Sequence, residues 1–319
     1  MIDELAGESR LIIKATLTPV VGSTFQPTGF PDLGAAEFER PIGEDKTEQA
    51  VLVESVQSLA NRLEDVGWDA VDDRPVPPIA GLPYVEVRDK EERFLTSSRL
   101  EPHRLAGAYI KQSSIGDKNA GDLMVERLGV KKEVPTDWRS VYRGIFQLDP
   151  LCLIHGVFFS DPSWKDYGNP KVRRAITAVI EAHGTRPVVS GGVKRDDVNP
   201  TAGESRTSKE GFGFVPFGRT EYTAEKIELD IAIDLEQING YGLGEAETDL
   251  LTALALWEVR SLLGRPMRLR TACDLELQAI DVRRPSGFEL PSADALADQI
   301  AKAGVAFESG SAPLTAIYG

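Results

Sequence analysis

Two glycines followed by two cations could bring the backbone of this chain against a phosphate. The stretch SGGVKRDDVNP contains Gly191 and Gly192, then Lys194 and Arg195, directly after the apolar run RPVV. Glycine lets a backbone approach a phosphate closely, and lysine and arginine neutralise its charge. A turn with solvated surface charges accounts for the same residues. The pattern alone therefore leaves both interpretations open.

Two other groups of residues could bind ions. The stretch SSRLEPHRLAG brings Arg99 and Arg104 close together, which fits either a phosphate clamp or a surface loop. Glu228, Asp230 and Asp234 alternate along one segment and could bind a divalent metal. Alternating carboxylates on an exposed strand face are, however, typical of plain solvation.

Motifs for common enzyme chemistry are absent from the sequence. It contains no G-x-x-x-x-G-K-[ST] loop, no G-x-G-x-x-G opening a helix and no G-x-S-x-G elbow. His103, His155 and His183 are isolated, and Cys152 and Cys273 lie far apart, so a zinc site is not expected. We expect no cofactor. We also expect both cysteines to be buried free thiols in a reducing cytoplasm.

The charge of the chain is acidic overall but unevenly distributed. Its 319 residues carry a net charge of −14, which argues against a protein that coats nucleic acid. Residues 151–220, however, contain ten Lys/Arg and seven Asp/Glu, a net of +3. The glycine–cation stretch lies in this basic segment. No apolar run is long enough for a membrane span, and the polar start MIDELAGESR does not resemble a secretory signal.

Hydrophobic periodicity predicts the elements that would position these residues. Alternation predicts strands at 11–20, 224–238 and 267–280, and apolar β-type runs predict strands at 151–161 and 186–189. Helical spacing predicts helices at 48–67, 245–264 and 292–304, and an Asn169–Pro170 start with Gly184 beyond the end predicts another at 169–184. Residues 72–150 are less regular and are interpreted as an insertion. Alternating strands favour an α+β protein with an antiparallel sheet, helices on one face and ferredoxin-like topology.

Several long stretches together resemble one known family. They are VGSTFQPTGFPDLG, VESVQSLANRLE, SSRLEPHRLAG, RPVVSGGVKRDDVNP and GFGFVPFGRTEY. They are similar to the backbone subunit of the CRISPR type I-G (formerly I-U) Cascade, the "Cas seven" family of the RAMP superfamily. The resemblance runs from about Leu11 to Glu276.

The resemblance implies a fold and a role. The fold is a single RRM-type palm over 1–319, with a fingers insertion within 66–150 and a thumb hairpin or loop at 191–222. Copies of the subunit polymerise along the guide RNA (crRNA), which pairs with target DNA. The implied partners are a large subunit, a fused cap and processing subunit, and a recruited helicase–nuclease. The subunit itself is expected to be non-catalytic and cytoplasmic.

The resemblance also implies which residues contact the guide. Gly191 and Gly192 would be the hinge of the thumb, with Lys194 and Arg195 on guide phosphates. The other expected contacts are Ser23, Gln57, Asn61, Arg62, Arg99 and Arg104. They would bind phosphate and ribose rather than base edges, because the guide sequence varies. The alternative is a metal-dependent RNA endonuclease that uses Asp32, as in type III relatives of the superfamily.

Overall fold

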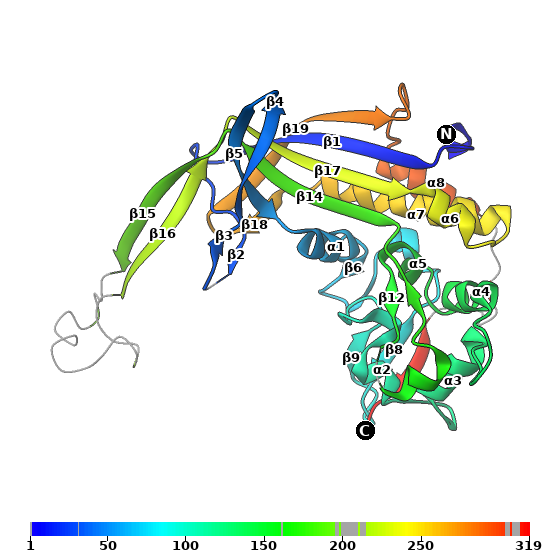
Figure 1. Ribbon diagram of the computed structural model, residues 1–319. Helices are drawn as coiled ribbons and strands as arrows, with labels where there is room; N and C mark the ends of the chain where they lie inside the picture. The colour runs from blue at the N-terminus through cyan, green and yellow to red at the C-terminus, as the bar shows by residue number, and fades with distance from the viewer. Residues whose placement is uncertain are drawn as a thin grey trace.

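A seven-stranded antiparallel sheet is the centre of the computed structural model (Figure 1). The structure describes residues 2–30, 32–160, 162–194, 198, 210, 215–303, 307 and 313–319. In sheet order the strands are β18 (Met267–Arg270), β19 (Cys273–Arg284), β1 (Arg10–Pro19), β17 (Lys226–Asp234), β14 (Ile176–His183), β5 (Lys46–Glu54) and β4 (Glu37–Gly43). The predicted α+β class with an antiparallel sheet is confirmed.

The inner face of the sheet is apolar because its strands alternate. In β1, Leu11 and Ile13 are fully buried, and their register partners in β17 are Ile233 and Ile231. The intervening residues are only partly covered, as the period of two requires. Helices α1 (Val56–Asp65) and α6 (Leu235–Gly240) contact this sheet, α7 (Glu245–Leu263) packs on both of them, and α8 (Ala293–Lys302) packs on α7.

Three of these helices, α1, α6 and α8, begin after a residue whose side chain caps them. Ser55 precedes α1, and its side chain accepts a hydrogen bond from the Ser58 amide at 3.3 Å. Ser292 does the same for α8, accepting from the Ala295 amide at 3.2 Å, so the predicted start of that helix is confirmed. No helix among the described ranges is both long and apolar enough to cross a membrane.

A second, five-stranded sheet lies within the insertion, in the order β11-β10-β20-β8-β9. Its strands are β8 (Val85–Arg88), β9 (Phe94–Ser97), β10 (Ser114–Ile115), β11 (Lys118–Asn119) and β20 (Leu314–Ile317). The last of these comes from far outside the predicted insertion and pairs in parallel with β8. Helices α2 (Ala108–Lys111), α3 (Ala120–Leu128), α4 (Trp138–Leu148) and α5 (Leu151–His155) accompany this sheet.

The position of β20 leads to a stability prediction. Ala316 is fully buried in this strand, whereas its neighbour Thr315 is exposed. Ala316→Asn should lower the free energy of unfolding by about 1–3 kcal/mol, because it places an amide in an apolar environment. Thr315→Asn is the matched control and should change stability by less than about 0.5 kcal/mol. Urea unfolding measures both, and equal effects would contradict the central place of β20.

The hairpin predicted as a thumb projects from the large sheet as two long strands (Figure 1). β15 (Arg186–Lys194) and β16 (Val215–Thr223) pair antiparallel along their whole length, with Gly191 opposite Gly218. Arg195 and the residues between the two strands, apart from 198 and 210, lie outside the described residues. The remaining short elements are η1 (Ile2–Leu5), β2 (Gly29–Phe30), β3 (Gly34–Ala35), β6 (Trp68–Asp69), β7 (Arg74–Pro75), η2 (Pro77–Ile79), η3 (Arg104–Ala106), β12 (Val157–Phe158), η4 (Pro162–Tyr167) and β13 (Lys171–Val172).

Two predicted elements are wrong, and they are neighbours. The predicted strand 151–161 is the buried helix α5 followed by the two-residue strand β12. The predicted helix 169–184 is β13 followed by β14, in which Ile176, Ala178, Ile180 and Ala182 alternate as buried residues. Asn169 has a φ of 47°, so it does not start a helix.

Three further boundaries differ from prediction. The stretch predicted as a strand at 224–238 is β17 up to Asp234 and helix α6 from Leu235 onward. The helix predicted at 48–67 starts only at Val56, because the residues before it form β5. The strand predicted at 267–280 is a tight hairpin of β18 and β19. Both cysteines are free and buried, as predicted, although Cys152 lies in α5 rather than in a strand.

Candidate nucleic-acid interface

Helix α1 lies on the side of the large sheet toward which both the β15–β16 hairpin and the insertion extend (Figure 1). Leu59 and Leu63 bury one face of this helix against the core. Gln57 and Asn61, one helical turn apart, are exposed on the other face. Both are among the predicted RNA contacts, and both have amide groups that can bind phosphate or ribose.

A pair of arginines that the sequence patterns did not indicate lies beside this helix. Arg174 Nη2 donates to Gln57 Oε1 at 2.9 Å, and Arg173, next to it, is exposed. Burial, together with the nearby charge of Arg104, lowers the pKa of Arg174, so an anion bound there would stabilise its charged form. We define the α1 surface as Gln57, Asn61, Arg173 and Arg174.

Two other predicted contacts, Ser23 and Arg62, differ in how exposed they are. Ser23 is exposed in the loop after β1. That loop is fixed to the root of the hairpin, because Thr24 Oγ1 donates to Glu221 Oε2 at 2.8 Å and the backbones of Phe25 and Tyr222 bond to each other. Arg62 is partly covered, and its Nη2 donates to the Leu269 carbonyl at 2.8 Å. Arg62 thus connects α1 to β18.

The predicted glycine hinge lies inside a strand. Gly191 and Gly192 are exposed residues of β15, as is Lys194. A Cβ on Gly191 would approach the Phe217 carbonyl oxygen to 2.7 Å, so close strand pairing explains this glycine. Arg195 lies outside the described residues. Of the predicted phosphate-binding pair, only Lys194 is therefore placed, at the exposed end of β15.

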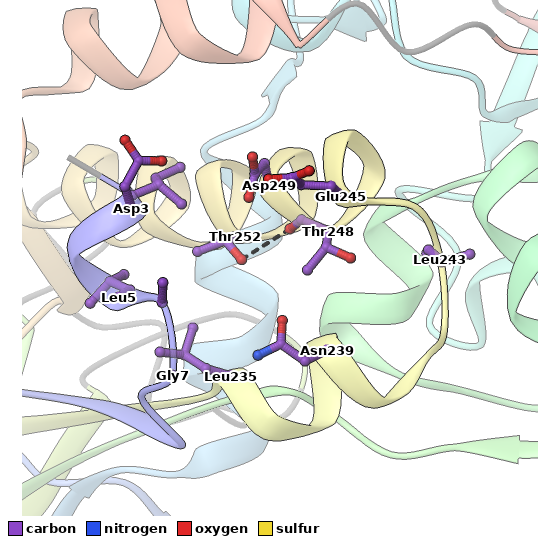
Figure 2. Close-up of a pocket in the computed structure, with 12 residues that line it drawn as sticks. Asp3, Leu5, Gly7, Leu235, Asn239, Leu243, Glu245, Thr248, Asp249 and Thr252 are labelled. Atoms are coloured by element: carbon purple, nitrogen blue, oxygen red, sulfur yellow. Dashed lines mark hydrogen bonds between the residues drawn. The ribbon is translucent and has the colours of Figure 1, made fainter.

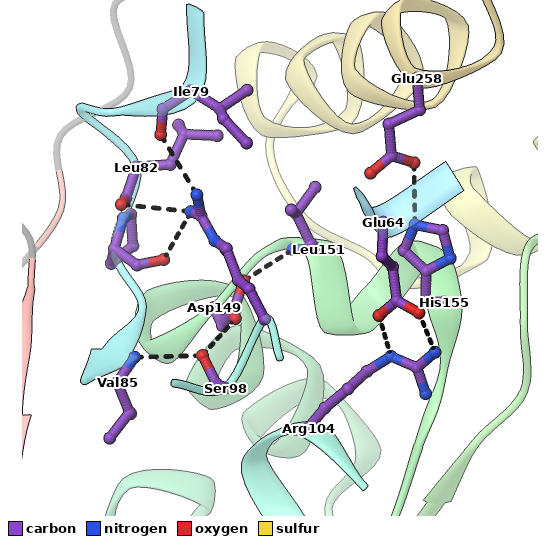
Figure 3. Close-up of polar contacts among 12 residues, drawn as sticks. Glu64, Ile79, Leu82, Val85, Ser98, Arg104, Asp149, Leu151, His155 and Glu258 are labelled. Carbon is purple, nitrogen blue, oxygen red and sulfur yellow. Dashed lines mark hydrogen bonds and ion pairs between the residues drawn. The ribbon is translucent and has the colours of Figure 1, made fainter. Parts of the chain in front are cut away.

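The predicted clamp residues Arg99 and Arg104 are buried. Arg99 donates to the carbonyls of Ile79 and Leu82 at 3.4 and 3.3 Å, and its Nε lies 3.8 Å from Asp149 (Figure 3). Its guanidinium also donates to the Pro83 carbonyl and lies over the Tyr84 ring.

Arg104 forms a two-point contact that joins the insertion to α1. Its Nε and Nη2 donate to the two Glu64 carboxylate oxygens at 2.6 and 2.7 Å, and its Nη1 donates to the Gly156 carbonyl (Figure 3). In this arrangement neither Arg99 nor Arg104 presents an exposed donor to an RNA phosphate. Arg99 joins segments within the insertion, whereas Arg104 joins the insertion to α1 and to Gly156.

A third buried pair, His155 and Glu258, adjoins these arginines. His155 Nε2 and Glu258 Oε2 lie 2.8 Å apart, and both side chains are fully covered (Figure 3). Burial acts to lower the pKa of His155, but the carboxylates of Glu258 and Glu64 outweigh it and raise that pKa. Burial raises the pKa of Glu258 against the opposing effect of His155. The folded pair therefore holds a proton more firmly than the unfolded chain does.

This pair predicts a pH dependence whose sign one substitution reverses. The stability from a raised histidine pKa is present below the unfolded pKa of about 6.5 and is lost as pH rises through the folded value. In Glu258→Gln the main opposing carboxylate is gone, so burial should lower the His155 pKa and stability should instead fall as pH drops below about 6.5. The substitution should also cost about 1–3 kcal/mol.

Urea midpoints between pH 5.5 and 8.5 test the reversal. The double variant His155→Gln with Glu258→Gln is the control, since it removes the titration of the pair and leaves His183 unchanged. If the urea midpoint changes equally with pH in the native chain and in Glu258→Gln, the protonation of this pair is not linked to folding.

The acidic residues do not form a metal site in the part of the chain that the structure describes. Asp32 is exposed on the turn between β2 and β3, and no group of three or more His, Cys, Asp or Glu among the described residues could hold a metal. Lys14 Nζ lies 2.9 Å from Asp230 and 3.6 Å from Glu228. Glu228 is buried rather than solvated, and burial opposes the lowering of its pKa by Lys226 and Lys14. These residues therefore provide no metal ligands that could support RNA cleavage by Asp32.

An acidic cavity of about 490 Å³ lies near the N-terminal turn, and none of its lining residues belongs to the α1 surface (Figure 2). It lies between η1, α6 and the start of α7, and three of its lining residues are Asp3, Glu245 and Asp249. Burial, with the charges of Glu245 and Asp3, raises the pKa of Asp249. Such a cavity repels phosphate, which leaves the α1 surface as the better candidate for a polyanion.

Comparison with known proteins gives a family and distant structural likenesses. The family described as "CRISPR-associated protein GSU0053" matches residues 11–187. No curated protein matches the chain. A chain of a "CRISPR RNA-guided surveillance complex, pre-nicking" is 12% identical at a TM-score of 0.42, covering 86% of this chain and 75% of that one. Csc2 of Thermofilum pendens is 12% identical at a TM-score of 0.32, covering 96% and 75%. A chain of another "CRISPR RNA-guided surveillance complex" is 13% identical at 0.37, covering 90% and 74%.

Proposed function

Because this chain belongs to the CRISPR-associated protein GSU0053 family, we propose that it is the guide-RNA-binding backbone subunit of a type I-G Cascade. Copies of the chain polymerise along the guide, each holding a short segment, and the guide pairs with target DNA. Its partners are further copies of itself, the large subunit, the fused cap and processing subunit, and a recruited helicase–nuclease. The subunit is non-catalytic and works in the cytoplasm.

The observation that carries this proposal is the α1 surface. Arg174 and Gln57 are joined by a hydrogen bond, and the neighbouring Arg173 and Asn61 are exposed. Helix α1 lies between the β15–β16 hairpin and the insertion (Figure 1). A row of amides and guanidiniums suits phosphate and ribose, and it reads no sequence. That is what a protein needs when the guide it binds varies.

The order of the sheet supports a ferredoxin-like palm. The four central strands run β19-β1-β17-β14, with α1 in the connection from β1 to β14 and α7 between β17 and β19. A split βαβ unit repeated in one sheet gives this order. We propose that the insertion is the fingers and the β15–β16 hairpin the thumb.

The experiment is a purification with partners present. The chain is tagged, co-expressed with the other Cascade subunits and a repeat–spacer array, purified, and its bound nucleic acid is sized. We expect a discrete RNA of one repeat–spacer unit in a large particle. A nucleic-acid-free monomer in the presence of folded partners would overturn the proposal.

A further inference from the structure

A cleft of about 800 Å³ lies between the short β2–β3 hairpin and the root of β16. Clefts of this size hold small ligands or single groups of larger ones. One wall is formed by Phe30 and Leu33 of the hairpin. The opposite wall is formed by Arg219 and Tyr222 of β16, and Arg270 also lines the cleft.

The β2–β3 hairpin leaves an aromatic ring uncovered. Phe30 is 64% exposed and Leu33 is 81% exposed. The strand partner of Phe30 is Gly34, which has no side chain to cover the ring. Gly34 has a φ of +72°, and a Cβ on Gly29 would lie 2.9 Å from the Gly34 carbonyl oxygen, so the tight turn depends on both glycines. The exposed Phe30 ring lines the cleft, so it is available to stack against a ligand there.

The opposite wall is polar, and its groups are held in place. The Tyr222 hydroxyl donates to Glu37, and burial, followed by this hydrogen bond and by the Glu37 charge, raises the pKa of Tyr222 to about 12. Arg219 lies 5.6 Å from the centre of the Phe217 ring and pairs with Glu221. Arg270 donates to the Gln26 carbonyl at 2.7 Å. The cleft thus sets one free aromatic face opposite fixed donors and acceptors.

We propose that this cleft holds one nucleobase of the bound RNA, stacked on Phe30, with its phosphate toward Arg219. This inference rests on the proposed function, since it requires an RNA on the surface between hairpin and insertion. A nucleobase has the two properties that the walls call for: an apolar face and a polar edge. Stacking tolerates all four bases, which suits a variable guide. The backbones of Phe25 and Tyr222 are hydrogen-bonded to each other, which joins the loop before β2 to β16.

The test uses the assembled complex on a synthetic guide that carries 4-thiouridine. Irradiation followed by mass spectrometry should find a cross-link in the peptide that contains Phe30. Phe30→Ala should lose the cross-link and weaken guide retention about tenfold in a salt titration. Phe30→Trp should keep both, and Phe30→Leu, which is apolar but not aromatic, should behave as Phe30→Ala does. Val71→Ala is the matched control and should change neither, because Val71 is an exposed apolar residue between β6 and β7 that does not line the cleft.

Each contrary result has a separate meaning. A complex that binds guide but gives no cross-link at Phe30 overturns this inference and leaves the proposed function intact. Full retention in Phe30→Leu would also overturn it, and would indicate an apolar contact with a protein side chain. A native complex without guide RNA overturns the proposed function and the nucleobase cleft with it.

Discussion

Arg99→Ala should lower the free energy of unfolding by about 3–5 kcal/mol, because it leaves a buried carboxylate without its cation. Asp149 is almost fully covered, with the Ser98 hydroxyl and the Leu151 amide as its other partners. The pKa of Asp149 is raised by burial, against the effect of Arg99. Without Arg99 this carboxyl should bind a proton more readily, and the insertion should open first.

Urea unfolding measures the loss, and hydrogen exchange of the insertion locates it. Lys194→Ala is the control, since Lys194 is exposed at the end of β15 and its loss should cost less than about 0.5 kcal/mol. Normal stability of Arg99→Ala together with loss of guide RNA would instead support the phosphate contact that the sequence suggested.

Arg173→Glu with Arg174→Glu should strongly weaken guide retention. Each charge-assisted hydrogen bond to a phosphate contributes about 1.5–3 kcal/mol, or about ten- to a hundredfold in affinity. Every copy along the guide would be weakened at once. The slope of log affinity against log salt should also fall by about one for each phosphate that a copy no longer neutralises.

A matched double reversal controls for net charge. Lys46 at the start of β5 and Lys302 at the end of α8 are exposed cations away from the α1 surface. Lys46→Glu with Lys302→Glu changes the net charge equally and should leave guide retention and its salt slope unchanged. Equal losses in both double variants would mean that overall charge, rather than the α1 surface, governs RNA binding.

The sequence predicts those elements whose pattern is long and local. Strand β17 is confirmed up to Asp234 because its nine residues alternate. Helix α7 is confirmed because its apolar segment is nineteen residues long, which is too long for a typical strand. Helix α5 has only five residues, all buried, and a fully buried short segment has no periodicity to separate helix from strand. At 169–184 the Asn-Pro start and the final glycine favoured a helix, although Ile, Ala, Ile and Ala alternate through β14.

The residues of the candidate site also differ in whether a local sequence pattern predicts them. Gln57 and Asn61 could be expected on an exposed face because α1 is amphipathic. Arg173 and Arg174 were not predicted as RNA contacts, because the sequence placed them inside the incorrectly predicted helix 169–184. The one sequence signal for them was the excess of positive charge in residues 151–220. The burial of Arg104 could not be read from sequence, since its partner Glu64 is 40 positions away and meets it only in the folded chain. Side chains whose environment depends on tertiary contacts need the structure.

The parallel pairing of β20 with β8 sets the order of events on the ribosome. About 225 residues separate the end of β8 from the start of β20. At a translation rate of about 5–20 residues per second, β8 and β10 have an unpaired edge for roughly 10–45 s before β20 is synthesised. An unpaired strand edge invites pairing with another chain. Nascent copies translated close together on one message are therefore at greatest risk of joining wrongly through the insertion, and a chaperone that shields this edge would raise the yield of correctly folded subunit.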